Sequence, residues 1–178
     1  MQVSLNSSNE NSELTLLSPY DITANSYDTL YSEEQQAKYS IVLYKINIEL
    51  NDRVLDAGCG TCLLYEYLIS KNMSFQYYVG LDISRGMLEK CLDKRVFTDP
   101  RVDIVLGNIE ETPFRINSFT KVFAFTVLDL VDKEKALSEL KSLVKQGIIV
   151  YTLLKSRGCK PGIEGESSVK DCIYLLIV

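Results

Sequence analysis

The chain has 178 residues, an apolar fraction of 46% and a formal net charge of −5. This length favours one globular domain, and the acidic balance argues against a large phosphate-binding surface of its own. The sequence contains no histidine, which excludes Ser-His and Cys-His catalysis and the histidine-ligated zinc hydrolases. We expect no metal site.

The first residues carry no targeting signal that we recognise. Residues 1–18 lack the basic and apolar regions of a signal peptide, and no apolar run reaches the eighteen or so residues that cross a bilayer. They are rich in Ser, Asn and Glu, so we expect them to be mobile. These observations predict a cytoplasmic protein without a membrane contact.

Residues 19–50 are expected to form an N-terminal helix and lid. Ser32 and Gln35 have the spacing of a capping box, in which a hydroxyl and an amide close the first turn of a helix. The pattern predicts a helix over 33–48. Upstream, Tyr20 and Tyr27 are seven residues apart, which fits either a lid over a site or an apolar helix stripe. The sequence leaves these two alternatives open.

From residue 51 onward, short apolar segments alternate with helical ones. Strands are expected at 53–58, 77–82, 102–107, 121–127 and 147–154, and helices at 62–72, 85–95 and 133–145. This alternation predicts an α/β fold with a doubly wound, mostly parallel sheet and helices on both faces. Pro113 and Asn117 leave little room for a helix between the third and fourth strands.

The end of the chain departs from the alternating pattern. Residues 155–166 have the composition of a loop, and 172–178 have that of a strand. A loop without a helix does not easily return the chain for a parallel neighbour. We therefore expect the last strand to lie antiparallel beside strand five. Residues 1–178 then form a single domain, with 51–178 as its core.

The segment Asp56-Ala57-Gly58-Cys59-Gly60-Thr61-Cys62 lies between an expected strand and an expected helix. Gly58 and Gly60 lack the Cβ that would keep a ligand away from the backbone. Twenty-two residues after Gly60, the next strand ends in Asp82, an acid placed to bind both hydroxyls of a ribose. The spacing predicts a site for a ribose-bearing cofactor.

Two other interpretations of this segment have to be weighed. A dinucleotide site requires a third glycine at position 63, where this chain has Leu63, so a nicotinamide cofactor is the weaker alternative. Cys59 and Cys62 form a C-x-x-C pair, which is typical of redox or zinc sites. No second such pair exists, and we expect ordinary loop thiols. A disulfide within the loop is a further alternative if the source is a hyperthermophile.

An ordered set of further segments resembles the class I S-adenosylmethionine-dependent methyltransferases, in particular small single-domain members and archaeal ones. The segments are Val54–Cys62, Gly80–Leu88, Gly107–Phe114, Ser118–Val122 and Lys135–Gly147. The resemblance covers roughly residues 20–155. It implies a Rossmann-like methyltransferase fold with S-adenosylmethionine as cofactor.

The resemblance also implies a role for each cofactor-binding residue. At the methionine end these are Asp56, the loop residues Gly58, Cys59 and Gly60, and, near the sulfonium, Phe125 and Thr126. At the nucleoside end they are Asp82 for the ribose, Ile83 packed on adenine, and Asn108 and Ile109 along the adenine edge. Tyr20 and Tyr27 resemble tyrosines that close over the site in related enzymes.

Two departures from the family pattern affect this site. Cys62 occupies the position of the third glycine, and its thiol is expected to crowd the methionine portion of the cofactor. Asn108 replaces a commoner Asp, but an amide still hydrogen-bonds the adenine amino group. After strand four, Asp132 is expected to cap a helix, which leaves Asp129 as the candidate substrate contact.

The resemblance implies methyl transfer to an acceptor that the sequence does not identify, either a small molecule or an RNA or protein bound with a partner subunit. The alternative is a non-catalytic S-adenosylmethionine-binding subunit of a methyltransferase complex. Strand three, residues 102–106, is expected at the sheet edge and is apolar enough to accept a partner's strand. Some archaeal and eukaryotic methyltransferases use a small zinc-containing activator subunit in that way.

Overall fold

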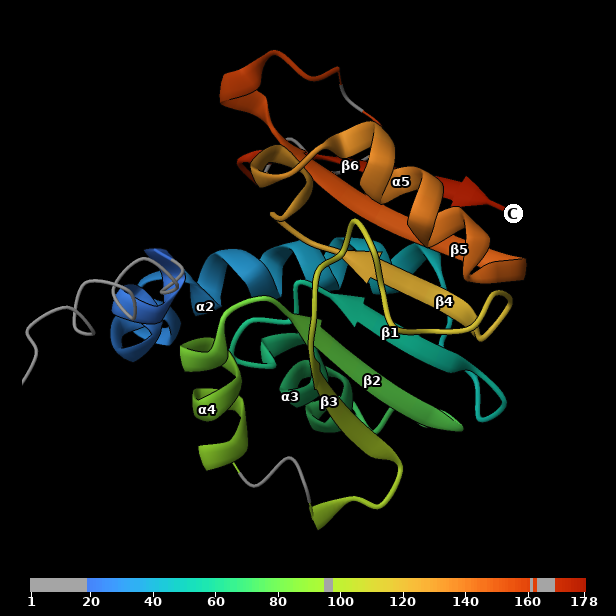
Figure 1. Ribbon diagram of the computed structural model, residues 1–178, viewed down its shortest axis with the longest axis horizontal. Helices are drawn as coiled ribbons and strands as arrows, with labels where there is room; N and C mark the ends of the chain where they lie inside the picture. The colour runs from blue at the N-terminus through green and yellow to red at the C-terminus, as the bar shows by residue number, and fades with distance from the viewer. Residues whose placement is uncertain (1–18, 95–97, 161, 163–168) are drawn as a thin grey trace, which may run out of the picture.

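A computed structural model describes residues 19–94, 98–160, 162 and 169–178. A six-stranded sheet in the order β3-β2-β1-β4-β5-β6 forms its centre (Figure 1). The strands are β1 (Arg53–Ala57), β2 (Tyr77–Asp82), β3 (Val102–Leu106), β4 (Phe119–Ala124), β5 (Val144–Leu154) and β6 (Asp171–Ile177). All neighbours are parallel except β6, which pairs antiparallel with β5. The predicted fold class and the place of the last strand are confirmed.

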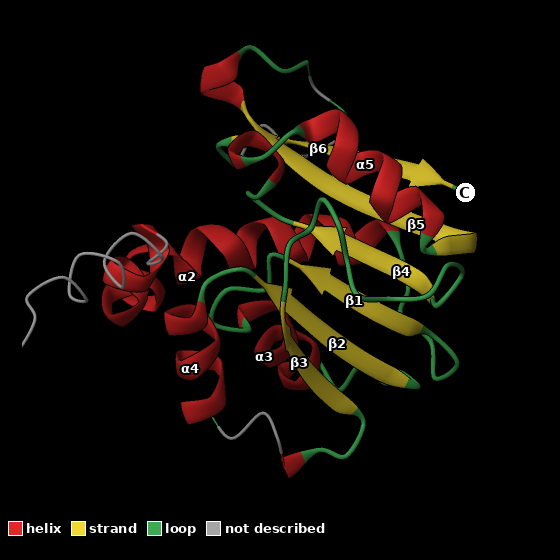
Figure 2. Cartoon of the chain, in the orientation of Figure 1, coloured by secondary structure: helices red, strands yellow, loops and turns green. Residues whose placement is uncertain are grey.

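Helices cover both faces of the sheet because its strands are apolar on both sides (Figure 2). On one face, α2 (Pro19–Lys45), α3 (Leu63–Ser70) and α4 (Arg85–Asp93) pack over residues such as Val54, Phe123 and Val150. On the other face, α5 (Lys133–Ser142) packs over Leu55 and Val122. The segment 107–118 joins β3 to β4 without a helix, as predicted.

The N-terminal helix begins well before the predicted position. α2 starts at Pro19, so Ser32 and Gln35 lie inside it and the predicted capping box is wrong. Residues 20–45 contain neither Gly nor Pro, and nothing in this stretch interrupts the helical backbone. Gln35 is buried, and it therefore has a different role from that of a cap.

Strand four also ends earlier than predicted. The chain leaves β4 after Ala124, and Thr126 adopts a left-handed backbone with φ of +57°. Residues 125–127 therefore turn into the loop beside the sheet. By contrast, Asp132 does cap α5, since its carboxylate accepts a hydrogen bond from the Lys135 amide at 3.1 Å. No helix among the described residues is both long and apolar enough to cross a membrane.

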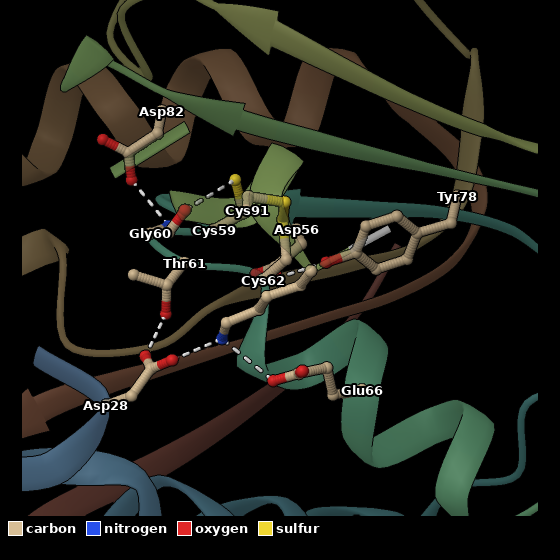
Figure 3. The surroundings of a disulfide bond; sticks show 11 residues. Asp28, Asp56, Cys59, Gly60, Thr61, Cys62, Glu66, Tyr78, Asp82 and Cys91 are labelled. Atoms are coloured by element: carbon tan, nitrogen blue, oxygen red, sulfur yellow. Dashed lines mark hydrogen bonds and ion pairs between the residues drawn. A yellow bond between two sulfur atoms is a disulfide. The ribbon is translucent and has the colours of Figure 1, made fainter. Parts of the chain in front are cut away.

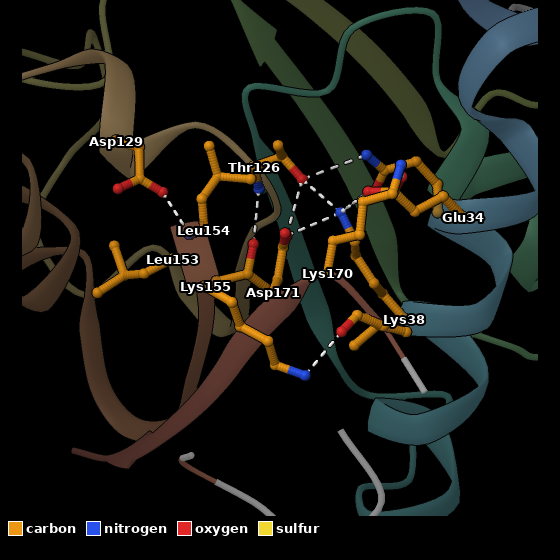
Figure 4. Close-up of polar contacts among 12 residues, drawn as sticks. Glu34, Lys38, Thr126, Asp129, Leu153, Leu154, Lys155, Lys170 and Asp171 are labelled. Atoms are coloured by element: carbon orange, nitrogen blue, oxygen red, sulfur yellow. Dashed lines mark hydrogen bonds and ion pairs between the residues drawn. The ribbon is translucent and has the colours of Figure 1, made fainter. Parts of the chain in front are cut away.

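A buried ion pair joins the N-terminal helix to the last strand (Figure 4). The side chains of Lys38 on α2 and Asp171 on β6 are both 0% exposed, and Lys38 Nζ lies 2.7 Å from Asp171 Oδ2. The same ammonium lies 3.1 Å from Glu34 Oε1 and donates a hydrogen bond of 2.8 Å to Thr126 Oγ1. One cation therefore links α2, the end of β4 and β6.

Replacing Lys38 with methionine is expected to destabilise the fold strongly. The substitution leaves the Asp171 carboxylate buried without its counter-charge, which typically costs about 3–5 kcal/mol. Urea unfolding followed by circular dichroism measures this difference. Lys45→Met, at an exposed position of the same helix, should change the free energy of unfolding by less than about 0.5 kcal/mol.

The double variant Lys38→Met with Asp171→Leu removes both charges. It is expected to recover most of the lost stability, because an apolar pair of similar volume avoids an unpaired buried charge. Equal stability of Lys38→Met and the wild-type protein would contradict this account of the ion pair.

Candidate functional site

A cavity of about 460 Å³ lies at the carboxyl ends of β1, β2 and β4. In a doubly wound sheet, ligands bind at this end, where the strand order reverses. A second, small cavity of about 20 Å³ lies beside it. The two share the lining residues Tyr27, Gly58, Gly60 and Phe125, so they lie side by side, and we treat them together as one continuous candidate site.

The glycine loop between β1 and α3 forms one wall of both cavities. Gly58 and Gly60 have φ angles of +79° and +53°, a region that favours glycine. The Asp82 carboxylate holds the loop, since its Oδ2 accepts a hydrogen bond from the Gly60 amide at 2.8 Å (Figure 3). The Gly58 amide donates to the Leu81 carbonyl at 2.7 Å. The ends of β1 and β2 are therefore fixed to each other at the site.

Cys62 follows the glycine loop and does not line either cavity. Its backbone is left-handed, with φ of +64°, and its fully buried sulfur forms a disulfide with Cys91 on α4 (Figure 3). The sulfur is therefore part of the contact between α3 and α4, and its position does not support the predicted crowding. The alternative of a disulfide within the loop is wrong, because Cys59 is a free, buried thiol.

Asp56 lies at the bottom of the small cavity and is 3% exposed. Its Oδ2 accepts a hydrogen bond of 2.5 Å from the Tyr78 hydroxyl. Burial raises the pKa of Asp56 to about 7, the Tyr78 hydrogen bond opposes this shift, and the charge of Asp82 adds to it. Burial therefore disfavours the charged form of Asp56, and a nearby cation would stabilise that form.

The larger cavity is lined by both polar and apolar groups. Asp82 Oδ1 accepts a hydrogen bond of 2.8 Å from the Ser84 amide, and Asp82 lines the cavity. Ile83 lines the cavity and is 62% exposed, while Ile109 is buried. Asn108 Oδ1 accepts a hydrogen bond of 2.9 Å from the Glu110 amide. These positions suit a ligand with hydroxyl groups and a flat apolar ring.

Most of the predicted cofactor-binding residues come together in this site. Those that line one or both cavities are Asp56, Gly58, Cys59, Gly60, Asp82, Ile83, Asn108, Ile109, Phe125, Thr126 and Tyr27. The side chain of Tyr20 lies outside the described residues. Tyr27 is half-buried and lines both cavities, which fits the lid interpretation of this residue.

Asp129 lies outside both cavity linings. Its Oδ2 accepts a hydrogen bond of 2.7 Å from the Leu154 amide, so it holds the end of β5 (Figure 4). Its role as a substrate contact stays a prediction.

Several lining residues were not predicted from the sequence. Gln35 and Tyr39 line the small cavity, and Met87, Val127, Leu130 and Val131 line the larger one. Gln35 lies eight residues after Tyr27, and Tyr39 lies four residues after Gln35, which places all three on one face of a continuous helix. Because the capping pattern placed the start of the helix at residue 33, Tyr27 fell outside the predicted helix and this spacing was not recognised. Among the described residues, no group of three or more His, Cys, Asp or Glu side chains is arranged to hold a metal ion.

Comparisons with known proteins agree with this geometry. A family model described as a methyltransferase domain matches residues 55–152. An uncharacterised protein of Methanocaldococcus jannaschii is 33% identical over 136 residues, which are 75% of this chain and 49% of that protein. A demethylmenaquinone methyltransferase of Lysinibacillus sphaericus is 30% identical over 116 residues, which are 65% of this chain and 49% of the enzyme. The chain thus spans about half the length of these curated relatives.

A solved structure shares the fold. It is the complex between the Trm112 methyltransferase activator of Haloferax volcanii and a protein named as a methyltransferase. The match has a TM-score of 0.67 and 21% sequence identity, and it covers 76% of this chain and 60% of the other. At this identity the match supports the fold.

Replacing Asp56 with asparagine is expected to make stability less sensitive to pH. The wild-type folded state holds a proton on Asp56 up to about pH 7, whereas the unfolded state loses it near its ordinary pKa of 3.8. Stability contributed by this group is therefore present at low pH and is lost as the pH rises to about 7.

Between pH 5 and pH 8, the free energy of unfolding of Asp56→Asn should rise by about 3 kcal/mol relative to that of the wild type, because one pKa unit corresponds to about 1.4 kcal/mol. Urea titrations at several pH values provide the measurement. Asp132→Asn makes the same change at an exposed cap and should show no such gain. A pH-independent difference for Asp56→Asn would contradict the assigned pKa.

Proposed function

The chain belongs to the class I S-adenosylmethionine-dependent methyltransferase family, and we propose that it transfers a methyl group from S-adenosylmethionine to an acceptor bound at the carboxyl ends of β1 and β4. The observation that carries the proposal is the continuous site, in which the glycine loop and Asp56 lie on one side and Asp82, Ile83 and Asn108 on the other. Its larger cavity, of about 460 Å³, falls in the usual range for small-molecule sites.

The residues present fit the two ends of this cofactor. Asp82, which ends β2 and lines the larger cavity, would accept hydrogen bonds from the ribose hydroxyls. Ile83 and Ile109 offer apolar surface to the adenine. A Cβ at Gly60 would meet no atom within 4 Å, so the backbone of this residue faces open space next to the cavity.

S-adenosylmethionine supplies a methyl group that its sulfonium already activates. The chain has to align the acceptor with that methyl group and exclude water. Phe125 is buried and Tyr27 half-buried at the junction of the two cavities, where aromatic rings favour a positive charge. The reaction does not require a strong base, so a sequence without histidine is compatible with it.

A small activator subunit at the edge of the sheet is part of this proposal. β3 is an end strand of the sheet, and Leu106 on it is 51% exposed. An apolar edge strand is a natural place for a partner's strand to pair. The similar structure of a protein bound to the Trm112 activator supports a partner of that kind. We propose that such a subunit pairs with residues 102–106.

Titration calorimetry is expected to show binding of S-adenosylmethionine and S-adenosylhomocysteine. Asp82→Ala should weaken both by at least tenfold, because it removes the ribose acceptors and the hydrogen bond to Gly60. Asp103→Ala, at an exposed position of β3, is the control and should bind like the wild type.

The same protein should transfer labelled methyl groups from S-adenosylmethionine into fractionated cell extract, and the labelled fraction then identifies the acceptor class. Tight binding without transfer into any fraction would favour a non-catalytic subunit. Binding of NADH in place of S-adenosylmethionine would favour a dehydrogenase.

The partner proposal predicts a stable one-to-one complex when the chain is co-expressed with the Trm112 homologue of its own source. Leu106→Arg should disrupt that complex, because it places a charge on the strand edge. Leu92→Arg changes a residue of α4 with a similar exposure of 48% and should leave the complex intact. Light scattering measures both masses. A monodisperse, fully active monomer would count against the partner.

A further inference from the structure

Gln35 has a buried oxygen atom that the fold leaves without a hydrogen-bond partner. The residue is 4% exposed and lines the small cavity beside the glycine loop. Its Nε2 donates a hydrogen bond of 3.2 Å to Thr126 Oγ1. Its Oε1 has no partner among the residues that the structure describes. A buried acceptor left in this state costs free energy, so its presence at a cavity requires an explanation.

The surrounding network determines which way the Gln35 amide faces. The Thr126 hydroxyl has one proton, and its best acceptor is the charged Asp171 carboxylate, 3.2 Å away. The lone pairs of Thr126 Oγ1 then accept from Lys38 Nζ at 2.8 Å and from Gln35 Nε2. A flipped amide would set two acceptor oxygens against each other. The nitrogen therefore faces Thr126, and Oε1 stays unpaired.

The small cavity has the chemistry of a cation site. Its ionisable lining includes the Asp56 carboxylate but neither Lys nor Arg. Tyr27, Tyr39 and Phe125 add aromatic rings, and the rings of Tyr39 and Phe125 are 5.0 Å apart. Two acceptors and aromatic surface favour a small ligand group that carries positive charge and N–H donors. A primary ammonium has both properties.

We propose that Gln35 is a cofactor-binding residue, and that its Oε1 and the Asp56 carboxylate together receive the primary ammonium of the cofactor's amino acid portion. This inference rests on the proposed function, since it places S-adenosylmethionine in the continuous site. The shared lining of the two cavities lets one ligand extend from the nucleoside side into the small cavity. A bound cation also lowers the cost of ionising the buried Asp56.

Lys38 and Asp171 are positioning residues in this arrangement. They do not line either cavity, but they hold the Thr126 hydroxyl, which in turn fixes the Gln35 amide. Thr126 has a left-handed backbone, with φ of +57°, in the turn after β4.

The substitution Gln35→Met tests the proposal, because methionine has a similar size but no acceptor oxygen. Calorimetry should show that S-adenosylmethionine and S-adenosylhomocysteine bind about tenfold or more weakly, as expected for one lost hydrogen bond to a charged group. 5′-Methylthioadenosine, which lacks the amino acid portion, should bind the variant and the wild type equally. Gln36→Met makes the same change at the adjacent exposed position and should affect none of the three ligands.

Three outcomes would overturn the inference. Unchanged affinity for S-adenosylmethionine would show that Gln35 does not contact it. An equal loss for 5′-methylthioadenosine would show that the substitution damages the whole site. An increase in the KM of the methyl acceptor alone would assign Gln35 to the acceptor. If the wild-type protein binds none of these ligands, the proposed function itself fails, and that result is distinct from the other three.

Discussion

The fold depends on a single buried ammonium group that reaches three elements. Lys38 Nζ contacts Asp171 on β6, Glu34 on its own helix and Thr126 at the end of β4. Two buried opposite charges are stable only when they face each other, so this contact strongly restricts where α2 can lie on the sheet. The helix then presents Tyr27, Gln35 and Tyr39 to the site. By holding α2 on the sheet, the Lys38–Asp171 ion pair thus determines which side chains of this helix line the site.

A second constraint holds the opposite side of the site. One carboxylate, that of Asp82, accepts hydrogen bonds from the Gly60 and Ser84 amides and so ties two strand-to-helix turns together. The Cys62–Cys91 disulfide links the helices that follow the same two turns. These contacts lie within the chain segment 56–91, whereas the residues that α2 contributes to the site depend on contacts between distant parts of the chain.

This difference explains how much of the site could be predicted from the sequence. Asp56, Gly58, Gly60 and Asp82 were predictable because strand and turn patterns place them locally, and the alternation of elements predicts a parallel sheet with helices on both faces. Gln35 was missed because a local capping pattern competed with a longer helix that tertiary packing favours. Cys62 and Lys38 pair with residues of other elements, and a local sequence pattern does not identify such partners.

The second disulfide has a consequence for where the protein can work. Cys172, bonded to Cys159, is the residue after Asp171, so the covalent link lies next to the carboxylate that neutralises Lys38. In a strongly reducing cell interior this link would open, and the last strand would then be held by its hydrogen bonds to β5 and by the Lys38–Asp171 ion pair. Whether the compartment keeps this disulfide oxidised therefore affects how firmly α2 is held against the sheet. Since α2 lines the ligand site, it also affects the shape of that site.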